Sequence, residues 1–164
     1  MNSELLENAT TEAPMVGLEG TVPRSINRLK PHDRQARTHS QRQIRKIAAS
    51  IERFGFVNPV LIDADNCIIA GHGRLEAAKT LGWTEVPTLC VDHLSDAEKR
   101  AYILADNRLA EDAGWDPEIL AIELQGLIDI DFSVELTGFE LAEVDQIIEV
   151  HSTAKTGWII YKFI

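Results

Sequence analysis

The chain has 164 residues, of which 45% are hydrophobic, and a formal net charge of −10 at pH 7. This length suits one domain with an apolar core, and the negative charge argues against a general nucleic-acid coat protein, which needs clustered Lys and Arg. The sequence contains no apolar run of transmembrane length and no secretory signal pattern, so we expect a cytoplasmic protein.

Charge and periodicity divide the chain into parts. Residues 1–22 contain four acidic and no basic side chains and lack hydrophobic periodicity, which predicts a disordered acidic leader. We expect one domain over residues 23–150 and leave residues 151–164, which end in an apolar run, as a tail or a truncated continuation. Residues 24–53 hold nine basic and two acidic side chains, whereas residues 94–150 hold three and fifteen. The basic segment predicts a surface that meets phosphate, and the acidic half is either solvated or faces a basic partner.

The first expected elements are a short strand around Ile26 and a helix that begins after Ser40. Ser40 and Gln43 form a capping-box pattern, apolar residues follow at helical spacing, and Gly55 predicts the helix end. The polar side of this helix is basic, and we expect it to bind DNA phosphates weakly and without sequence preference. The residues expected to make these contacts are Arg42, Arg45 and Lys46.

Two apolar runs, residues 59–62 and 67–70, are separated by turn-forming residues and predict a β-hairpin. A short helix that ends at Gly82 and a third strand at residues 86–91 should follow. Because the two cysteines, Cys67 and Cys90, lie in these runs, we expect buried thiols rather than a disulfide. The histidines and cysteines do not follow the spacing of a metal site.

Three capping patterns predict helices in the acidic half, over residues 96–106, 117–128 and 140–150. The residues that cap these helices are Ser95, Asp116 and Thr137. Because the strands come early in the chain and the helices late, the sequence predicts an α+β fold rather than a doubly wound parallel sheet.

The most informative motif is the strand-to-helix junction Gly71-His72-Gly73-Arg74. Two glycines allow a ligand to approach the backbone, the first amides of the helix point outward, and Arg74 adds a cation. These donors suit a phosphate group, although an ordinary tight turn fits the spacing equally well. The motif is neither a Walker loop nor a GxGxxG fingerprint.

Three sequence blocks, residues 58–62 (NPVLI), 69–79 (IAGHGRLEAAK) and 81–87 (LGWTEVP), resemble the ParB-like domain of the ParB/sulfiredoxin-like fold. They are most similar to the phage and plasmid variant that often precedes a DNA methyltransferase. The resemblance covers residues 24–150 and implies a small mixed sheet with packed helices. It also implies a nucleoid-associated protein that is able to form a homodimer.

The resemblance implies a bound nucleoside triphosphate, CTP or ATP, with Mg²⁺. In ParB proteins a glycine-acid-arginine-arginine box at this junction holds the triphosphate, and the matching residues here are Gly71, Arg74, Ala77 and Ala78. His72 stands in place of the acid, Gly73 in place of the first arginine and Glu76 where a further arginine is common. The loss of two arginines weakens the expected triphosphate binding. Arg37 matches a further arginine that touches the nucleotide.

A second box of the family, acid-Asn-x-x-Arg, is similar to the segment Asp106-Asn107-Arg108. The resemblance implies that Asp106 holds the Mg²⁺ ion and that Asn107 and Arg108 bind phosphates. Oxygen ligands suit a hard cation such as Mg²⁺. The alternative is an ordinary helix C-terminus, where Asn and Arg are common.

Together these features predict a nucleotide-binding regulatory or targeting module in a bacterial DNA transaction, such as partition, phage or plasmid maintenance, or DNA modification. One alternative is a ParB-fold enzyme, a nuclease or an NTP-dependent phosphotransferase, in which Asp106, Glu76 or His72 would act. Another is an interaction domain with a degenerate site. Chromosomal ParB continues into a helix-turn-helix that reads DNA, and we expect this region to be missing here because the later helices lack a basic face. We therefore expect neither sequence-specific DNA reading nor methyltransferase activity from this chain, and a methyltransferase or another protein as its partner.

Overall fold

The computed structural model describes residues 20–32 and 38–160, with the last seven of these described by their backbone only. The described strands all lie before residue 91 and the longest helices follow, which confirms the α+β fold. The chain divides into two compact units, and the division along the sequence falls after Asp106. We had expected one domain over residues 23–150, and the two units are described separately below.

A four-stranded mixed sheet forms the centre of the first unit. Its strands are β1 (Val22–Ser25), β2 (Val60–Ile62), β3 (Ile68–Ala70) and β4 (Glu85–Cys90), in the order β1-β4-β2-β3. The β2/β4 pair is parallel and the other two pairs are antiparallel. The Thr88 hydroxyl of β4 donates a hydrogen bond to the Val22 carbonyl of β1 at 2.7 Å. The strand expected around Ile26 is instead a 3-10 turn, Ile26–Arg28.

The hairpin of β2 and β3 matches the sequence prediction, and Asp63 holds its turn. The Asp63 Oδ1 atom accepts hydrogen bonds from the backbone amides of Asp65 and Cys67, both at 2.9 Å. Its Oδ2 atom lies 3.3 Å from Lys99 Nζ. These contacts lower the pKa of Asp63, although burial, the largest single influence, acts in the opposite direction. The turn therefore depends on an ionised carboxylate.

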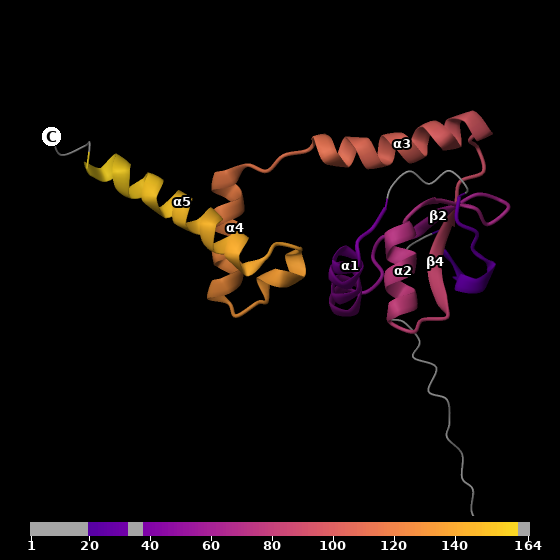
Figure 1. Cartoon of the computed structure of the whole chain (residues 1–164), viewed down its shortest axis with the longest axis horizontal. Helices are drawn as coiled ribbons and strands as arrows, with labels where there is room; N and C mark the ends of the chain where they lie inside the picture. The colour runs from indigo at the N-terminus through magenta and orange to yellow at the C-terminus, as the bar shows by residue number, and fades with distance from the viewer. Residues whose placement is uncertain (1–19, 33–37, 161–164) are drawn as a thin grey trace, which may run out of the picture. The chain divides into compact units, whose positions relative to one another are not determined.

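Helices α1 (Gln41–Phe54) and α2 (His72–Thr80) lie side by side (Figure 1) and enclose the main core with the sheet. Ser40 caps α1 as predicted, because its side chain accepts a hydrogen bond from the Gln43 amide at 3.1 Å. Gly55 ends the helix with φ +80°. The core contains Ile44, Ala48, Ile51, Phe56, Val60, Ile62, Leu75, Ala77, Ala78, Trp83 and Val86 among other side chains.

Helix α3 spans Asp96–Asp112 and is longer than the sequence predicted. Its start is the expected capping box, in which the Ser95 amide donates a hydrogen bond to Glu98 Oε2 at 2.8 Å and the Glu98 amide donates to Ser95 Oγ at 3.4 Å. Asp106, where we expected the helix to end, lies inside it. The box Asp106-Asn107-Arg108 is therefore helical and not a helix C-terminus.

The second unit contains α4 (Pro117–Asp129), the 3-10 turn η2 (Val134–Thr137) and α5 (Leu141–Ile160). Its small core is formed by Leu124, Val134 and Val144 with partly buried neighbours. Asp116 caps α4 as predicted. Thr137 does not cap α5, because its hydroxyl donates a hydrogen bond to the Val134 carbonyl and the helix begins four residues later. Helix α5 also continues to Ile160, beyond the end expected near Val150.

Both cysteines are reduced, but they are less buried than expected: Cys67 is half-buried and Cys90 is exposed at the end of β4. Strand β4 is buried at Val86, Pro87 and Thr88 only, so its end leaves the core. Among the helices that the structure describes, none has the length and apolar character needed to cross a membrane.

Candidate functional site

The junction between β3 and α2 is a tight turn whose backbone requires glycine at residue 71. Gly71 adopts φ +99°, and a Cβ atom there would lie 2.9 Å from Arg74 Nη2 and 3.3 Å from the Val60 Cα. The Leu75 amide donates to the Gly71 carbonyl at 3.0 Å and closes the first turn of α2. The three preceding amides have no acceptor within the helix because they lie in its first turn. They form the positive end of the helix, which attracts anions.

Arg74 connects this loop to the sheet. Its Nη2 atom donates a hydrogen bond to the Pro59 carbonyl at 3.1 Å, whereas its buried Nε atom has no partner within the described residues. Burial lowers the pKa of Arg74, and the carboxylate of Asp106 partly offsets this effect. The guanidinium remains charged at neutral pH. It therefore supplies a cation with unused donors beside the loop.

His72, the first residue of α2, is held in its neutral form. Its pKa is lowered from 6.5 to about 4, mainly by burial and further by the charges of His39 and His32, while Glu76 acts in the opposite direction. The buried Nε2 atom of His72 lacks a hydrogen-bond partner in the described part of the chain. An unsatisfied polar atom of this kind requires an explanation, such as a ligand that pairs with it.

His39, which precedes the cap of α1, packs against the same loop. Its ring fills the space beside Gly73: a Cβ atom on Gly73 would lie 3.1 Å from His39 Cε1 and 3.2 Å from His39 Nε2. The ring is fixed by Gln43, whose Oε1 atom lies 3.1 Å from His39 Nδ1. The sequence alone did not indicate that His39 and Gln43 lie at the site, since their approach to the loop depends on how α1 packs against α2.

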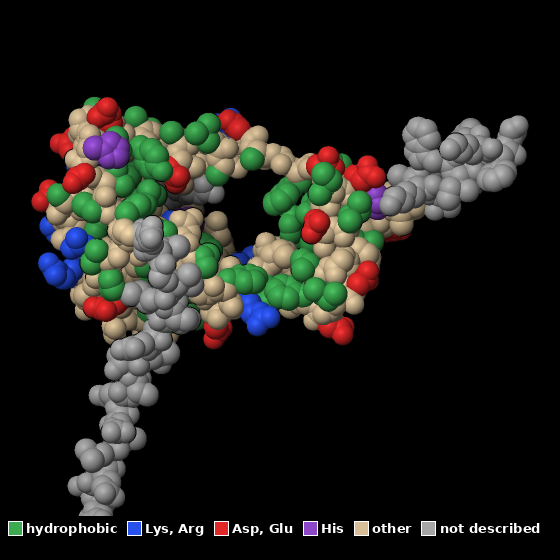
Figure 2. All heavy atoms as spheres, turned by 180° about the vertical axis from the view of Figure 1, so that it is seen from behind, with side chains coloured by type: hydrophobic (Ala, Val, Ile, Leu, Met, Phe, Trp, Pro, Cys, Tyr) green, Lys and Arg blue, Asp and Glu red, His purple; other side chains and the backbone are tan. Residues whose placement is uncertain are grey.

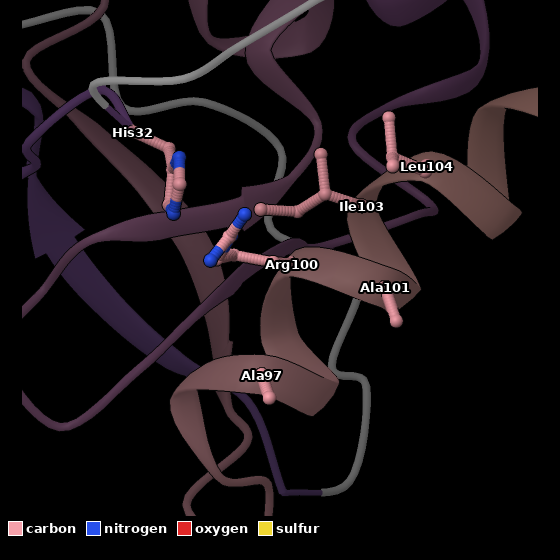
Figure 3. Close-up of a pocket in the computed structure, with 6 residues that line it drawn as sticks. All are labelled: His32, Ala97, Arg100, Ala101, Ile103 and Leu104. Atoms are coloured by element: carbon pink, nitrogen blue, oxygen red, sulfur yellow. The ribbon is translucent and has the colours of Figure 1, made fainter.

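A cavity of about 430 Å³ lies next to the histidines in the first unit. Its lining includes His32 and five α3 residues, Ala97, Arg100, Ala101, Ile103 and Leu104. The side chains of His32 and Arg100 point toward each other, and Ile103 lies beside them (Figure 3). The volume falls within the range of small-molecule sites. His32 lines this cavity and also contributes to the lowered pKa of His72.

The predicted second box, Asp106-Asn107-Arg108, lies within helix α3. Asp106 acts on Arg74 electrostatically, which places its carboxylate near the loop. Arg108 is exposed and forms ion pairs within its own helix, with Asp112 at 2.8 Å and Glu111 at 3.5 Å. No group of three or more potential His, Cys, Asp or Glu ligands is gathered in residues 20–32 and 38–153. A magnesium site at Asp106 would therefore need ligand phosphates, and it stays a prediction.

The remaining predicted site residues differ in their exposure. Arg42 and Arg45 are exposed on α1, whereas Lys46 is half-buried. The DNA contacts expected of these three residues stay a prediction. Arg37 lies outside the described residues. The helix that carries these basic side chains, α1, packs against α2, whose first turn forms the loop.

The four-stranded mixed sheet, the glycine junction and the paired helices α1 and α2 together form a small α+β domain. The model of the ParB N-terminal domain family matches residues 17–108, more than half of the chain, and the chain therefore belongs to this family. A second model, described as the ParB-methyltransferase HTH domain, matches residues 118–157. The expectation that a helix-turn-helix region is missing was therefore wrong. It rested on charge, since this segment holds nine acidic side chains and a single basic one, Lys155.

Several known proteins share this fold or sequence. The chain is 44% identical over 79 residues to the ParB-like nuclease domain-containing protein YnaK of Escherichia coli, which covers 48% of the chain and 91% of YnaK. It is 30% identical over 145 residues to the nucleoid occlusion protein of Lysinibacillus sphaericus, covering 85% of the chain but 47% of that protein. The crystal structure of C-terminally truncated ParB from Caulobacter crescentus with CTP-γ-S matches with a TM-score of 0.65 at 21% identity, covering 85% and 87% of the two chains. The chain thus spans about half the length of the nucleoid occlusion relative.

Proposed function

We propose that this chain is a nucleotide-binding regulatory or targeting module in a bacterial DNA transaction, and that it holds phosphates at Gly71 to Arg74. The observation that carries the proposal is the pair of unsatisfied buried atoms at this loop, His72 Nε2 and Arg74 Nε. Leaving such an atom unpaired costs about 1–3 kcal/mol, and an anion at the positive end of α2 would pair with both. The CTP-γ-S complex of the Caulobacter protein, which shares the fold, supports a nucleotide as the ligand.

The proposed ligand is CTP or ATP with Mg²⁺. Phosphate oxygens would accept hydrogen bonds from the first amides of α2 and from Arg74, and Asp106 would supply a carboxylate oxygen to the cation. Asn107 and Arg108 remain predicted phosphate ligands. The cavity beside His32 offers room for the nucleoside, because its volume suits a small molecule and its lining is largely apolar.

Isothermal titration of CTP, ATP, GTP and UTP, with and without Mg²⁺, tests this proposal. Arg74→Gln should weaken the binding of the preferred nucleotide by about 1.5–3 kcal/mol, the usual contribution of a hydrogen bond to a charged group. Arg53→Gln is the matched control, because Arg53 is exposed at the far end of α1. Since Arg74 also contacts Pro59, the melting temperature of each variant shows whether the fold is retained. Equal binding by wild type and Arg74→Gln would place the site elsewhere.

We further propose weak, sequence-indifferent DNA binding through the basic side of α1. Exposed arginines bind phosphates and release counterions, so the affinity should fall with salt. The double variant Arg42→Gln/Arg45→Gln should lower the slope of log K against log salt by about two, since each phosphate contact contributes about 0.9. Arg108→Gln, in the acidic unit, should leave the slope unchanged. Protection of one defined DNA sequence would contradict this proposal.

The second unit is proposed to bind a protein, such as a DNA methyltransferase, rather than DNA. Figure 2 shows acidic and hydrophobic side chains on its surface. Trp115, Ile119, Ile130 and Val150 are large apolar residues that are 60–71% exposed. The match to the ParB-methyltransferase HTH domain supports this type of partner, and the excess of acidic residues opposes contact with phosphates.

The enzyme alternative is kept because the relative YnaK is described as a ParB-like nuclease domain-containing protein. Incubation with plasmid DNA and with each nucleoside triphosphate, in the presence of Mg²⁺, separates the two classes. A binding module should leave both substrates intact. Hydrolysis that disappears in Asp106→Asn would favour the enzyme.

A further inference from the structure

Helix α4 is apolar on two opposite sides, and the core of the second unit covers only one of them. Leu124 is buried on the covered side, where Leu120 and Leu127 also pack against the core. Ile119 and Ile122 lie on the other side of the helix and are 60% and 50% exposed. A helix that is apolar all round is normally buried all round. The uncovered side of α4 therefore has the composition of a contact surface.

The uncovered residues form a continuous stripe along the helix. Ile119, Ile122 and Gly126 follow one another at helical spacing, which places them on one face. Ile130, the C-cap of α4, is 71% exposed and extends this row beyond the end of the helix. A Cβ atom on Gly126 would meet nothing within 4 Å, so another side chain can approach the backbone there. These four residues are called the α4 stripe below.

Acidic side chains border the α4 stripe on both sides. Glu118 and Ile122 are neighbours on the helix surface, as are Glu123 and Ile119, because the members of each pair are one turn apart. Both glutamates are exposed, and α4 contains no Lys, Arg or His. A partner surface that is complementary to the stripe therefore needs apolar side chains bordered by Lys or Arg.

This charge pattern selects one kind of partner. A second copy of the chain would bring the same acidic borders face to face, which opposes association. DNA phosphates and anionic lipid head groups would be repelled by the same carboxylates. An exposed apolar patch rimmed by polar side chains is typical of a protein-binding surface. An amphipathic helix presents apolar side chains at the spacing that such a narrow surface requires.

We propose that the α4 stripe is the docking site for a basic amphipathic helix of a partner protein. The apolar side chains of the partner cover Ile119 and Ile122, and its Lys or Arg side chains pair with Glu118 and Glu123. This inference rests on the proposed function, in which the second unit binds a protein, and it names the surface and the chemistry of the partner. The apolar contact supplies most of the affinity, whereas the charges determine orientation and the rate of association.

The test uses the full chain and two synthetic amphipathic peptides of the length of α4. Both have Leu along one face, which is bordered by Lys in the first peptide and by Glu in the second. Calorimetry measures the affinity, and the amide NMR signals of α4 and α5 show where each peptide binds. The Leu/Lys peptide should bind and shift the signals between Ile119 and Ile130, with an affinity that falls as salt is added. The Leu/Glu peptide should not bind.

A pair of serine substitutions tests the apolar contact. Ile119→Ser/Ile122→Ser should lower the affinity for the Leu/Lys peptide by about tenfold or more, since burying a single isoleucine is worth about that factor. The net charge is unchanged, so the effect is not one of electrostatics. Leu141→Ser/Val150→Ser is the matched control, because both residues are exposed apolar side chains of α5, outside the stripe.

A pair of amide substitutions tests the acidic borders. Glu118→Gln/Glu123→Gln should flatten the dependence of the affinity on salt, because exposed charges act through an attraction that salt screens. Asp145→Asn/Glu149→Gln removes two exposed charges from α5 and should leave most of the salt dependence in place.

Gly126→Gln separates docking from folding. Gln is a better helix former than Gly, and a Cβ atom at this position meets nothing within 4 Å, so the melting temperature should rise. The same side chain occupies the middle of the stripe and leaves its amide unpaired beneath the partner, so the affinity should fall by about tenfold. A variant that is more stable yet binds more weakly has not lost binding through misfolding.

The outcomes separate this inference from the proposed function. Binding of the Leu/Lys peptide that is lost in Ile119→Ser/Ile122→Ser and kept in Leu141→Ser/Val150→Ser supports the proposal. The opposite pattern overturns the α4 stripe and leaves a second unit that binds proteins. Failure of the Leu/Lys peptide to bind, or equal binding of the Leu/Glu peptide, overturns the stated partner.

Two other occupants of the stripe are tested with the same chain. Self-association that Ile119→Ser/Ile122→Ser abolishes, measured by sedimentation equilibrium, overturns the proposal in favour of a second copy. Binding of the Leu/Lys peptide only after deletion of residues 158–164 overturns it in favour of that apolar segment of the chain. DNA that shifts the amide signals of α4 and α5 overturns both this inference and the proposed role of the second unit.

Discussion

Replacing Gly71 with alanine should destabilise the first unit much more than the same change at Gly82. Both glycines have positive φ, +99° and +75°, where an L-residue loses about 1–2 kcal/mol. A Cβ atom on Gly82 meets nothing within 4 Å, whereas on Gly71 it lies 2.9 Å from Arg74 Nη2 and 3.3 Å from the Val60 Cα. The guanidinium must then move and lose its bond to Pro59, which adds about 1.5–3 kcal/mol. We expect a total of about 3–4 kcal/mol for Gly71→Ala.

Urea unfolding followed through the amide NMR signals of β2 and β4 measures this effect in the first unit alone, because a chain of two units need not unfold in one step. Gly82→Ala is the control and should cost about 1–2 kcal/mol. Gly71→Ala should also lose nucleotide binding, since the displaced Arg74 no longer faces the phosphates. Equal destabilisation by the two substitutions would refute the crowding argument at Gly71.

Three further predictions concern single side chains. Asp63→Ala should cost about 3 kcal/mol at neutral pH, measured by urea unfolding, because two backbone amides and Lys99 lose a charged acceptor. The contribution of Asp63 is present above its unfolded pKa and lost as the pH falls through its lowered folded pKa, so the difference between wild type and variant should shrink in acid. His72 binds a proton more weakly in the folded state than in the unfolded state, because its folded pKa is lowered to about 4. The free energy of unfolding should therefore fall by roughly 2 kcal/mol as the pH drops from 6.5 to about 4, a figure that allows for the half-burial of the ring. His72→Gln should remove this pH-dependent loss. Asp116→Ala should cost about 1 kcal/mol in the second unit, read from the amide signals of α4, since two amides lose their cap.

Local patterns predicted the elements that short-range chemistry determines. The caps at Ser40, Ser95 and Asp116 are in place, because each satisfies amides within three residues along the chain. The third capping pattern failed at Thr137, where a competing 3-10 turn uses the hydroxyl. The parallel pairing of β2 with β4 joins residues far apart in sequence, such as Leu61 and Leu89, and no local pattern predicts it.

The residues of the candidate site divide in the same way, into those that a short motif reveals and those that only the packing of distant elements brings together. The sequence predicted the loop from Gly71 to Arg74, since glycine spacing and a cation are visible in a short motif. It did not predict that His39 would cover Gly73 or that Gln43 would hydrogen-bond to that ring, because the approach of the ring to the loop depends on the packing of α1 against α2. The only signal in the sequence for the role of His39 was its position directly before the helix cap Ser40. The helix-turn-helix segment was missed for a different reason. Its lack of basic side chains was used to decide whether this fold is present.

The distribution of charge between the units changes what the net charge means for function. Residues 107–164 contain twelve acidic and three basic side chains, so they carry −9 of the total charge of −10. The electrostatic argument against nucleic-acid binding therefore applies to the second unit and not to the first, which is close to neutral and presents its arginines on α1. Because α1 packs against α2, a triphosphate bound at the Gly71 to Arg74 loop would bring net negative charge close to the helix that carries the proposed DNA-binding arginines. Nucleotide binding and DNA binding should then oppose each other, and by linkage each ligand should lower the affinity for the other by the same factor.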